Sequence, residues 1–216
     1  DHVPTSTVRG QYRAGRGGPA YREESGVADN SEVETYAACR LHVDNWRWAD
    51  VPFYLRTGKR LAVKQSQVVI EFRKVPLNLF QEMDCDLGGA NRLCLRISPN
   101  EGVSLLFDAK VPGAKMLLRP VRMHFDYDTT FASATPEAYE RLLLDAIQGQ
   151  ATLFIRDDEV EAAWRVVDSI RKAWEVSGEP KLAAYDPGSW GPGQADDLFH
   201  DPYQRWYNVV HTAKES

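Results

Sequence analysis

The stretch RLCLRISPNEGVSLLFDAK, residues 92–110, decides the fold class. Its first half alternates, with Leu93, Leu95 and Ile97 facing away from the residues between them. Period-two alternation of this kind is typical of a β-strand that buries one face. The second half alternates in the same way, and only residues 98–102 separate the two. A connection this short cannot hold a crossover helix, so the stretch predicts two antiparallel strands.

Other segments extend this pattern on both sides. Residues 34–48 alternate roughly, 68–73 clearly, and 121–127 clearly. A strand covered on both faces would be continuously apolar, so these strands are predicted to be half-exposed. The connection after residue 110 opens with a Val-Pro-Gly turn. We therefore expect a large, mostly antiparallel sheet.

Two helices are predicted after the strands. Thr135, Pro136 and Glu137 form a helix start, and apolar residues then recur at helical spacing up to Gly149. A second helix is predicted from Asp157 or Asp158 to Gly178, and a short one near residues 194–199. Strands followed by helices indicate an α+β fold with helices packed on one sheet face. The other face is left to solvent or to a partner subunit.

Residues 1–31 are rich in Gly, Pro, Ser and Arg, which predicts a poorly packed linker segment before an α+β domain at residues 32–216. The sequence opens on Asp1 without an initiator Met. We therefore expect it to be cut from a longer chain.

Composition excludes several classes of protein. The chain has 216 residues and a net charge of −5, which argues against a nucleic-acid surface. No apolar run approaches the roughly 20 residues that span a bilayer. The three cysteines are Cys39, Cys85 and Cys94, an odd number without CxxC spacing. They indicate a reducing, cytoplasmic location without disulfides or zinc.

A search for catalytic groups returns little. None of the five histidines has a metal-binding or catalytic spacing, and no serine lies in a GxSxG elbow. Residues 15–18 are glycine-rich but lack the preceding strand and following helix of a dinucleotide loop. We expect no catalytic, cofactor-binding or metal-binding residue in this chain.

One polar cluster stands out, the basic turn Arg56-Thr57-Gly58-Lys59-Arg60 followed by Lys64. Several cations beside a strand end can bind a phosphate or sugar hydroxyls through charge-assisted hydrogen bonds. Lysine and arginine are mostly exposed in any protein, so the pattern alone favours a solvated basic turn.

Long motifs, in order, resemble the glucose-6-phosphate dehydrogenase family over almost the whole chain. The most specific is DNWRWADVPFYLRTGKRL at residues 44–61. The others are VRGQY at 8–12, ETYAACRL at 34–41, SPNEGVSL at 98–105, PEAYERLLLDAIQG at 136–149, DEVEAAWRVVD at 158–168 and GSWGPGQAD at 188–196.

The resemblance implies the C-terminal domain of a two-domain enzyme of the pentose phosphate pathway. Such an enzyme oxidises glucose 6-phosphate to 6-phosphogluconolactone and reduces NADP, which an N-terminal Rossmann domain binds. The base, a histidine, and the DHYLGKE-type phosphate motif precede VRGQY in the family and are absent here. His2 is not followed by YLGKE and is not that base. The chain alone is therefore expected to be inactive.

The resemblance also implies a substrate site. In the family, the lysine of the GK motif and a later basic residue contact the sugar phosphate, which implies Lys59 and Lys64 here. Arg56 and Arg60 are expected to shape the turn. The family often has a Gln near the substrate where this chain has Ser98. Subunits of the family associate through the open sheet face into dimers or tetramers. The alternative is a non-catalytic dimerisation or regulatory module with the same fold.

Overall fold

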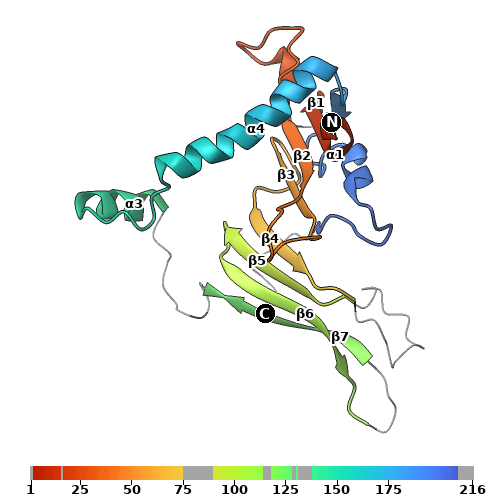
Figure 1. Ribbon diagram of the computed structural model, residues 1–216, viewed down its shortest axis with the longest axis vertical. Coiled ribbons are helices and arrows are strands. Elements are labelled where there is room, and N and C mark those ends of the chain that lie inside the picture. Colours follow the sequence, from red (N-terminus) through yellow and green to blue (C-terminus); the bar gives the residue numbers. More distant parts are fainter. Residues whose placement is uncertain are drawn as a thin grey trace. The chain divides into compact units, whose positions relative to one another are not determined.

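A computed structural model describes residues 2–15, 17–74, 90–113, 118–127, 130 and 138–208 (Figure 1). The chain divides into two compact units, one of residues 1–63 and 142–208 and the other of residues 64–141 and 209–216. The predicted α+β class is confirmed. The strands divide between two four-stranded sheets, one in each unit, in place of one large sheet.

The sheet of the first unit has the order β3-β2-β1-β8. β2 (Tyr36–Leu41) lies between β3 (Phe53–Gly58) and β1 (Thr7–Tyr12) and is antiparallel to both. β8 (Ala183–Tyr185) adds to the other side of β1 and runs parallel to it. This sheet therefore joins segments from the beginning and the end of the chain.

Poor packing was the wrong expectation for the strand β1. Five of its six residues are buried, because β2 and β8 pair with both of its edges. The one-turn helix α1 (Val3–Ser6) precedes β1, and the 3₁₀ helix η1 (Tyr21–Glu23) follows it. The glycine- and proline-rich composition of residues 1–31 therefore surrounds a central strand.

The core of the first unit is rich in tyrosine. Its buried members are Val8, Tyr12, Tyr36, Ala38, Tyr185, Ala195 and Leu198. The ring of Tyr36 lies 5.6 Å from that of Tyr185, and the ring of Tyr12 lies 6.3 Å from it. Leu198 ends the 3₁₀ helix η2 (Gly193–Leu198), which agrees with the short helix predicted near residues 194–199.

Burial raises the pKa of both Tyr12 and Tyr36 to about 12, because the interior disfavours the phenolate. An unfolded tyrosine titrates near pH 10, so the unfolded chain ionises first as pH rises. The stability from these two residues is complete below about pH 10 and lost towards pH 12. We expect the free energy of unfolding, measured with urea, to fall across this range. If the free energy of unfolding falls less in the Tyr36→Phe variant than in the wild type, ionisation of Tyr36 is confirmed as a source of the fall. Equal falls in the two proteins would contradict it.

The second unit holds an antiparallel meander of four strands. They are β4 (Ser66–Glu71), β5 (Arg92–Ser98), β6 (Gly102–Lys110) and β7 (Leu118–Asp126). Each strand pairs with the next one in the sequence, so the antiparallel hairpin predicted for residues 92–110 is confirmed. Arg96 of β5 forms an ion pair with Asp126 of β7.

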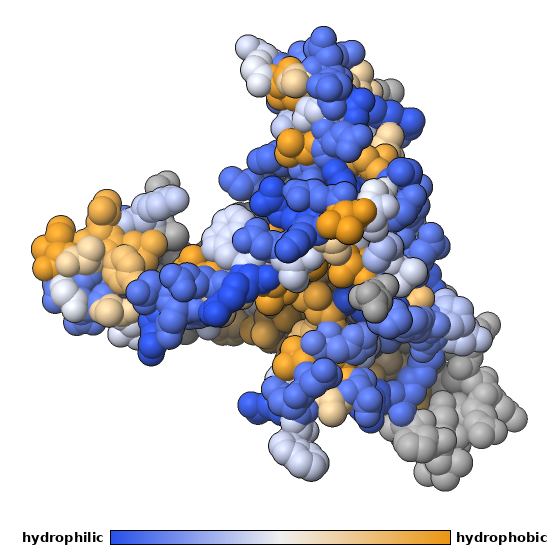
Figure 2. All heavy atoms as spheres, turned by 45° about the horizontal axis from the view of Figure 1, so that its top comes forward, coloured by the Kyte–Doolittle hydropathy of each residue, from blue (hydrophilic) through white to orange (hydrophobic). Residues whose placement is uncertain are grey.

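The two long helices are α3 (Ala138–Ile147) and α4 (Asp157–Ser177). The predicted start at residues 135–137 lies outside the described residues. α4 begins at the predicted residue and ends on Gly178, whose φ of +66° favours glycine. Figure 2 shows exposed apolar side chains on α3 at the left, where Leu143, Leu144 and Ile147 lie at the surface.

The apolar residues of α4 differ in how far they are exposed. Trp174 is buried, whereas Val160, Trp164 and Val167 are exposed. With Ile155, Glu159 and Ala163, these three line an apolar groove of about 300 Å³. Of the helices that the structure describes, none combines the length and the apolar composition of a membrane span.

Candidate functional site

The basic turn begins where β3 ends, and its backbone is fixed at Lys59. The Lys59 N–H donates to the Thr35 carbonyl at 2.8 Å, which extends the β2–β3 pairing by one residue. The Lys59 carbonyl accepts a hydrogen bond of 2.8 Å from the Tyr185 hydroxyl. Both backbone polar groups of Lys59 are therefore held inside the protein while its side chain is exposed.

Packing explains the glycine before Lys59. A Cβ atom at Gly58 would lie 2.8 Å from Cδ2 of Tyr36, which is closer than two carbon atoms approach. Tyr36 is paired with Gly58 in the sheet and is only 1% exposed, so its ring has no free space to move into. In the Gly-Lys pair of the motif, packing against Tyr36 thus requires the glycine, and the lysine exposes its positive charge to solvent.

The ammonium group of Lys59 has no carboxylate partner among the described residues, and the same holds for Lys64. An unpaired lysine keeps all three N–H donors for water or a ligand. A dianionic phosphate is a suitable ligand for such a group. Lys59 therefore has the properties that its predicted role requires.

Arg60 is held within the protein, as expected for a residue that shapes the turn. Its backbone has a φ of +52°. Its guanidinium donates to Glu24 at 2.6 Å and to the Pro19 carbonyl at 3.2 Å. It also lies over the Tyr12 ring, 4.6 Å from the centroid. These contacts occupy the charge of Arg60 and join the turn to residues 19–24.

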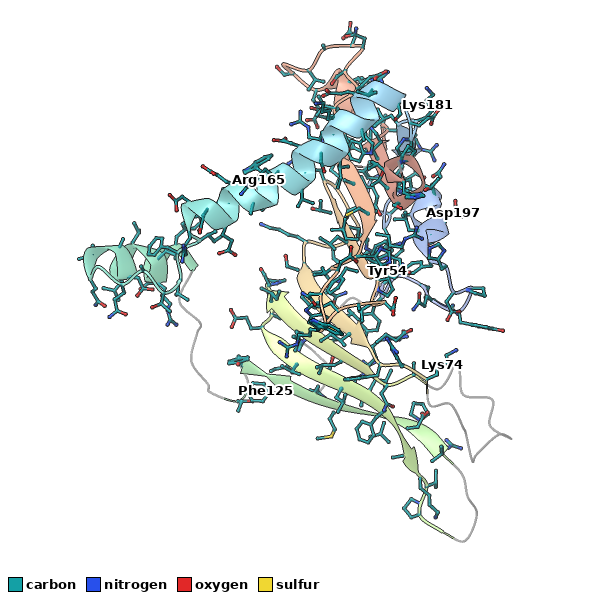
Figure 3. All side chains as sticks on the ribbon, in the orientation of Figure 1. Tyr54, Lys74, Phe125, Arg165, Lys181 and Asp197 are labelled. Carbon is teal, nitrogen blue, oxygen red and sulfur yellow. The ribbon has the colours of Figure 1, made fainter. Side chains whose placement is uncertain are left out.

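Arg56 is likewise structural. Its guanidinium lies between the indoles of Trp190 and Trp206, 5.0 and 4.7 Å from their centroids, and donates to Asn208 at 2.5 Å. Burial lowers the pKa of Arg56, yet a guanidinium stays protonated at neutral pH. The neighbouring Tyr54, labelled in Figure 3, also contacts Trp206 edge to face, with 6.4 Å between the ring centroids. β3 is therefore tied to the C-terminal segment.

Lys64 is exposed and is the first residue of the second unit, whereas Lys59 belongs to the first unit. The residues after Lys64 line a polar pocket of about 20 Å³ at the ends of β4 and β5. Ser98 lines the same pocket, with Pro99 and Asn100. This volume is close to that of one water molecule, so the pocket holds no sugar phosphate by itself.

The histidines are dispersed. His124 is exposed in β7, His2, His42 and His200 are exposed outside the helices and strands, and His211 lies outside the described residues. Within the ranges that the structure covers, no group of three or more His, Cys, Asp or Glu side chains could hold a metal ion.

Two of the cysteines lie in strands. Cys39 of β2 and Cys94 of β5 are both free, and burial raises the pKa of each thiol. A raised pKa keeps the thiol protonated and unreactive, which is typical of a cysteine that fills space in a core. Cys85 lies outside the described residues.

Two residues of this site, Thr35 and Tyr185, were not predicted from the sequence. Each contacts Lys59, yet they are separated from it by 24 and 126 positions. The positions of β2 and β3 could have placed Thr35 beside Lys59 once their register was known. No local signal marks Tyr185, because its contact depends on the three-residue strand β8.

Comparison with known proteins places these features in a family. The family model "Glucose-6-phosphate dehydrogenase, C-terminal domain" matches residues 1–207. Glucose-6-phosphate 1-dehydrogenase of Treponema pallidum is 48% identical over 97% of this chain and 42% of its own length. The enzyme of Rhizobium meliloti is 45% identical over 97% of this chain and 43% of its own length.

Solved structures agree. A glucose-6-phosphate dehydrogenase in complex with its substrate glucose 6-phosphate has a TM-score of 0.79 at 30% identity, over 92% of this chain and 40% of that one. The enzyme of Mycobacterium avium has a TM-score of 0.77 at 34% identity, over 97% of this chain and 41% of that one. This chain thus spans about two fifths of the relatives it matches, and it belongs to the family of glucose-6-phosphate dehydrogenase C-terminal domains.

Proposed function

We propose that this chain is the substrate-side and oligomerisation domain, residues 32–216 with the segment 1–31 before it, of an NADP-dependent glucose-6-phosphate dehydrogenase. The complete enzyme oxidises C1 of glucose 6-phosphate and yields 6-phosphogluconolactone and NADPH. The observation that carries the proposal is Lys59, an exposed cation with no carboxylate partner among the described residues, on a fixed backbone within the motif RTGKRL.

Lys59 binds the phosphate of the substrate. A phosphate monoester carries close to two negative charges at neutral pH, and an ammonium group gives it charge-assisted hydrogen bonds. Because the backbone of Lys59 is already fixed, only its side-chain torsions become ordered when the phosphate binds, and this reduces the entropy lost on binding. Lys64 is a further substrate-binding residue in this proposal, on the strength of the family resemblance alone. Neither lysine takes part in the redox step, so their contribution is to binding and orientation.

NADP is the acceptor of the hydride, and residues outside this chain hold it. Gly15 and Gly18, in the glycine-rich stretch, form a tight turn closed by two reciprocal backbone hydrogen bonds of 3.1 Å. In the part of this stretch that the structure describes, no strand leads directly into a helix N-terminus, and the next element is the three-residue η1. This turn does not fit a pyrophosphate. We therefore infer that the chain alone produces no NADPH.

Subunits associate into a dimer or a tetramer through a sheet face, and the enzyme is cytoplasmic. The register of β4–β7 puts apolar residues on one face, including Val68, Leu95 and Phe125, and polar ones such as Arg122 on the other. A sheet with two such faces can cover one with helices and use the other for association. The free Cys39, which is partly buried, and the free, buried Cys94 suit a reducing compartment.

Replacing Lys59 by alanine in the complete enzyme is expected to raise the KM for glucose 6-phosphate about tenfold to hundredfold. A hydrogen bond to a charged group contributes roughly 1.5–3 kcal/mol, and each 1.4 kcal/mol is tenfold in binding. The KM for NADP should stay the same, because the nucleotide does not contact Lys59. Steady-state kinetics with each substrate varied in turn measures both values.

The matched control for this substitution is Lys172→Ala, which removes another exposed lysine, in α4. Alanine is well accepted in helices, so this variant should keep the wild-type kinetics. If Lys59→Ala also keeps the wild-type KM for glucose 6-phosphate, the substrate role fails. The non-catalytic dimerisation or regulatory module is then the better interpretation.

A further inference from the structure

A buried tyrosine hydroxyl holds the backbone from which Lys59 projects. Tyr185 ends β8 and is 3% exposed. Its hydroxyl lies 2.8 Å from the Lys59 carbonyl oxygen, 3.1 Å from the Thr35 carbonyl oxygen and 3.0 Å from Thr35 Oγ1. The side chain thus reaches from β8 to the end of β3, and these are the two outer strands of the four-stranded sheet.

The hydrogen bonds around Thr35 have one consistent direction. The Tyr12 backbone N–H donates to Thr35 Oγ1 at 3.1 Å. Thr35 Oγ1 then donates to the Tyr185 oxygen, which leaves the Tyr185 proton for the Lys59 carbonyl. The Thr35 carbonyl accepts the Lys59 N–H at 2.8 Å. Every group in this chain of hydrogen bonds has a partner, and the chain fixes both the N–H and the carbonyl of Lys59.

The hydroxyl of Tyr185 remains a donor at all physiological pH values. Burial raises its pKa above the ordinary value for tyrosine, although hydrogen bonds with Thr35 and Lys59 act in the opposite direction. The bond to Lys59 is therefore present throughout the working range of an enzyme.

We propose that Tyr185 is a positioning residue for Lys59 and sets the affinity for glucose 6-phosphate without touching it. This inference rests on the proposed function, in which Lys59 binds the phosphate. Displacement of a binding group by about 1 Å can cost up to a hundredfold in rate or affinity. The Lys59 Cα cannot shift towards solvent while its N–H and its carbonyl are both held inside the protein.

A purely structural role is the alternative. The ring of Tyr185 packs on Tyr12 and Tyr36 and belongs to the core whatever its hydroxyl does. Phenylalanine keeps this packing and removes only the hydroxyl. Tyr185→Phe therefore separates the two roles.

In the complete enzyme, we expect Tyr185→Phe to raise the KM for glucose 6-phosphate about threefold to tenfold. This is the range that one neutral hydrogen bond supports. The kcat and the KM for NADP should stay within about twofold of wild type, because the hydroxyl contacts neither the reacting atoms nor the nucleotide.

The control is Tyr36→Phe, which removes another buried phenol in the same core. The Tyr36 hydroxyl has no hydrogen-bond partner in the described part of the chain, so it forms no hydrogen bond to Lys59. Its loss should leave the KM for glucose 6-phosphate unchanged. An equal rise of KM in both variants would mean that general softening of the core is the cause, and the positioning role would be overturned.

A double-mutant cycle with Lys59→Ala gives the sharpest test. If Tyr185 acts through Lys59, adding Tyr185→Phe to Lys59→Ala changes KM no further. The inference is overturned if Tyr185→Phe raises KM by the same factor in the wild-type enzyme and in the Lys59→Ala variant. It is also overturned if Tyr185→Phe leaves KM unchanged while Lys59→Ala raises it. In that second case the proposed function still stands. If Lys59→Ala itself has no effect, the proposed function fails and the positioning role fails with it.

A second pair of variants covers the case in which Tyr185→Phe does not fold. Thr35→Val removes the hydroxyl that orients Tyr185, and Thr35→Ser keeps it. We expect a raised KM for glucose 6-phosphate in Thr35→Val and a wild-type KM in Thr35→Ser. Equal KM values in these two variants would overturn the inference.

Discussion

Replacing Trp174 by alanine is expected to destabilise the first unit by about 3–5 kcal/mol, the usual range for a buried tryptophan. Trp174 is 6% exposed, and among the described residues of α4 it is the one that is buried. Its indole N–H donates to Thr7 Oγ1 at 2.8 Å, and the Arg9 guanidinium lies 5.4 Å from its ring centroid. Alanine would leave a cavity and remove both contacts to β1.

Urea denaturation followed by far-UV circular dichroism measures this effect. Trp174→Phe keeps most of the ring volume and loses the indole N–H, so its cost should be nearer to about 1 kcal/mol. Val176→Ala is the matched control, since Val176 lies in the same helix and is exposed. If Trp174→Ala and Val176→Ala unfold at the same urea concentration, Trp174 does not anchor the helix.

Local sequence patterns were sufficient to predict the structure where segments that are neighbours in the sequence pair with each other. The hairpin of β5 and β6 follows from two alternating runs and the short connection at residues 98–102, because a short turn permits only antiparallel pairing. The end of α4 at Gly178 was equally local, since only the residues beside it decide the cap. Such features need no knowledge of the rest of the chain.

Long-range pairing was beyond the sequence pattern. β1 is a central strand because β8, more than 170 positions later, pairs with it in parallel. Three residues are too few for a recognisable strand pattern, and the composition around β1 is typical of a linker. The division into two sheets at residues 63 and 64 has the same cause, since alternation predicts strands but not where a sheet ends.

The candidate site shows the same contrast. Lys59 was predicted through a motif of 18 residues, whereas basic residues in a turn would not have identified it alone. That Arg56 and Arg60 shape the turn was also predicted, and their aromatic and carboxylate partners explain why. Tyr185 was not predicted, because its hydroxyl meets Lys59 only after both outer strands are in place.

Gly191→Ala should destabilise the first unit by about 3 kcal/mol. Two independent terms contribute to this cost. Gly191 has a φ of +105°, and a non-glycine residue in the left-handed region costs roughly 1–2 kcal/mol. A Cβ atom would also lie 2.3 Å from Cε2 of Tyr36, and overpacking of a core costs about 1–3 kcal/mol. Tyr36 is confined, because Gly58 borders its ring as well.

Gly188→Ala separates the two terms. Gly188 has a φ of +80° and nothing within 4 Å of an added Cβ, so alanine there meets only the backbone cost. Urea denaturation should therefore show Gly191→Ala to be less stable than Gly188→Ala by about 1–3 kcal/mol. Equal stabilities would mean that the Tyr36 ring yields freely. In that case Gly58 could also accept alanine, and the packing explanation for the glycine before Lys59 would be wrong.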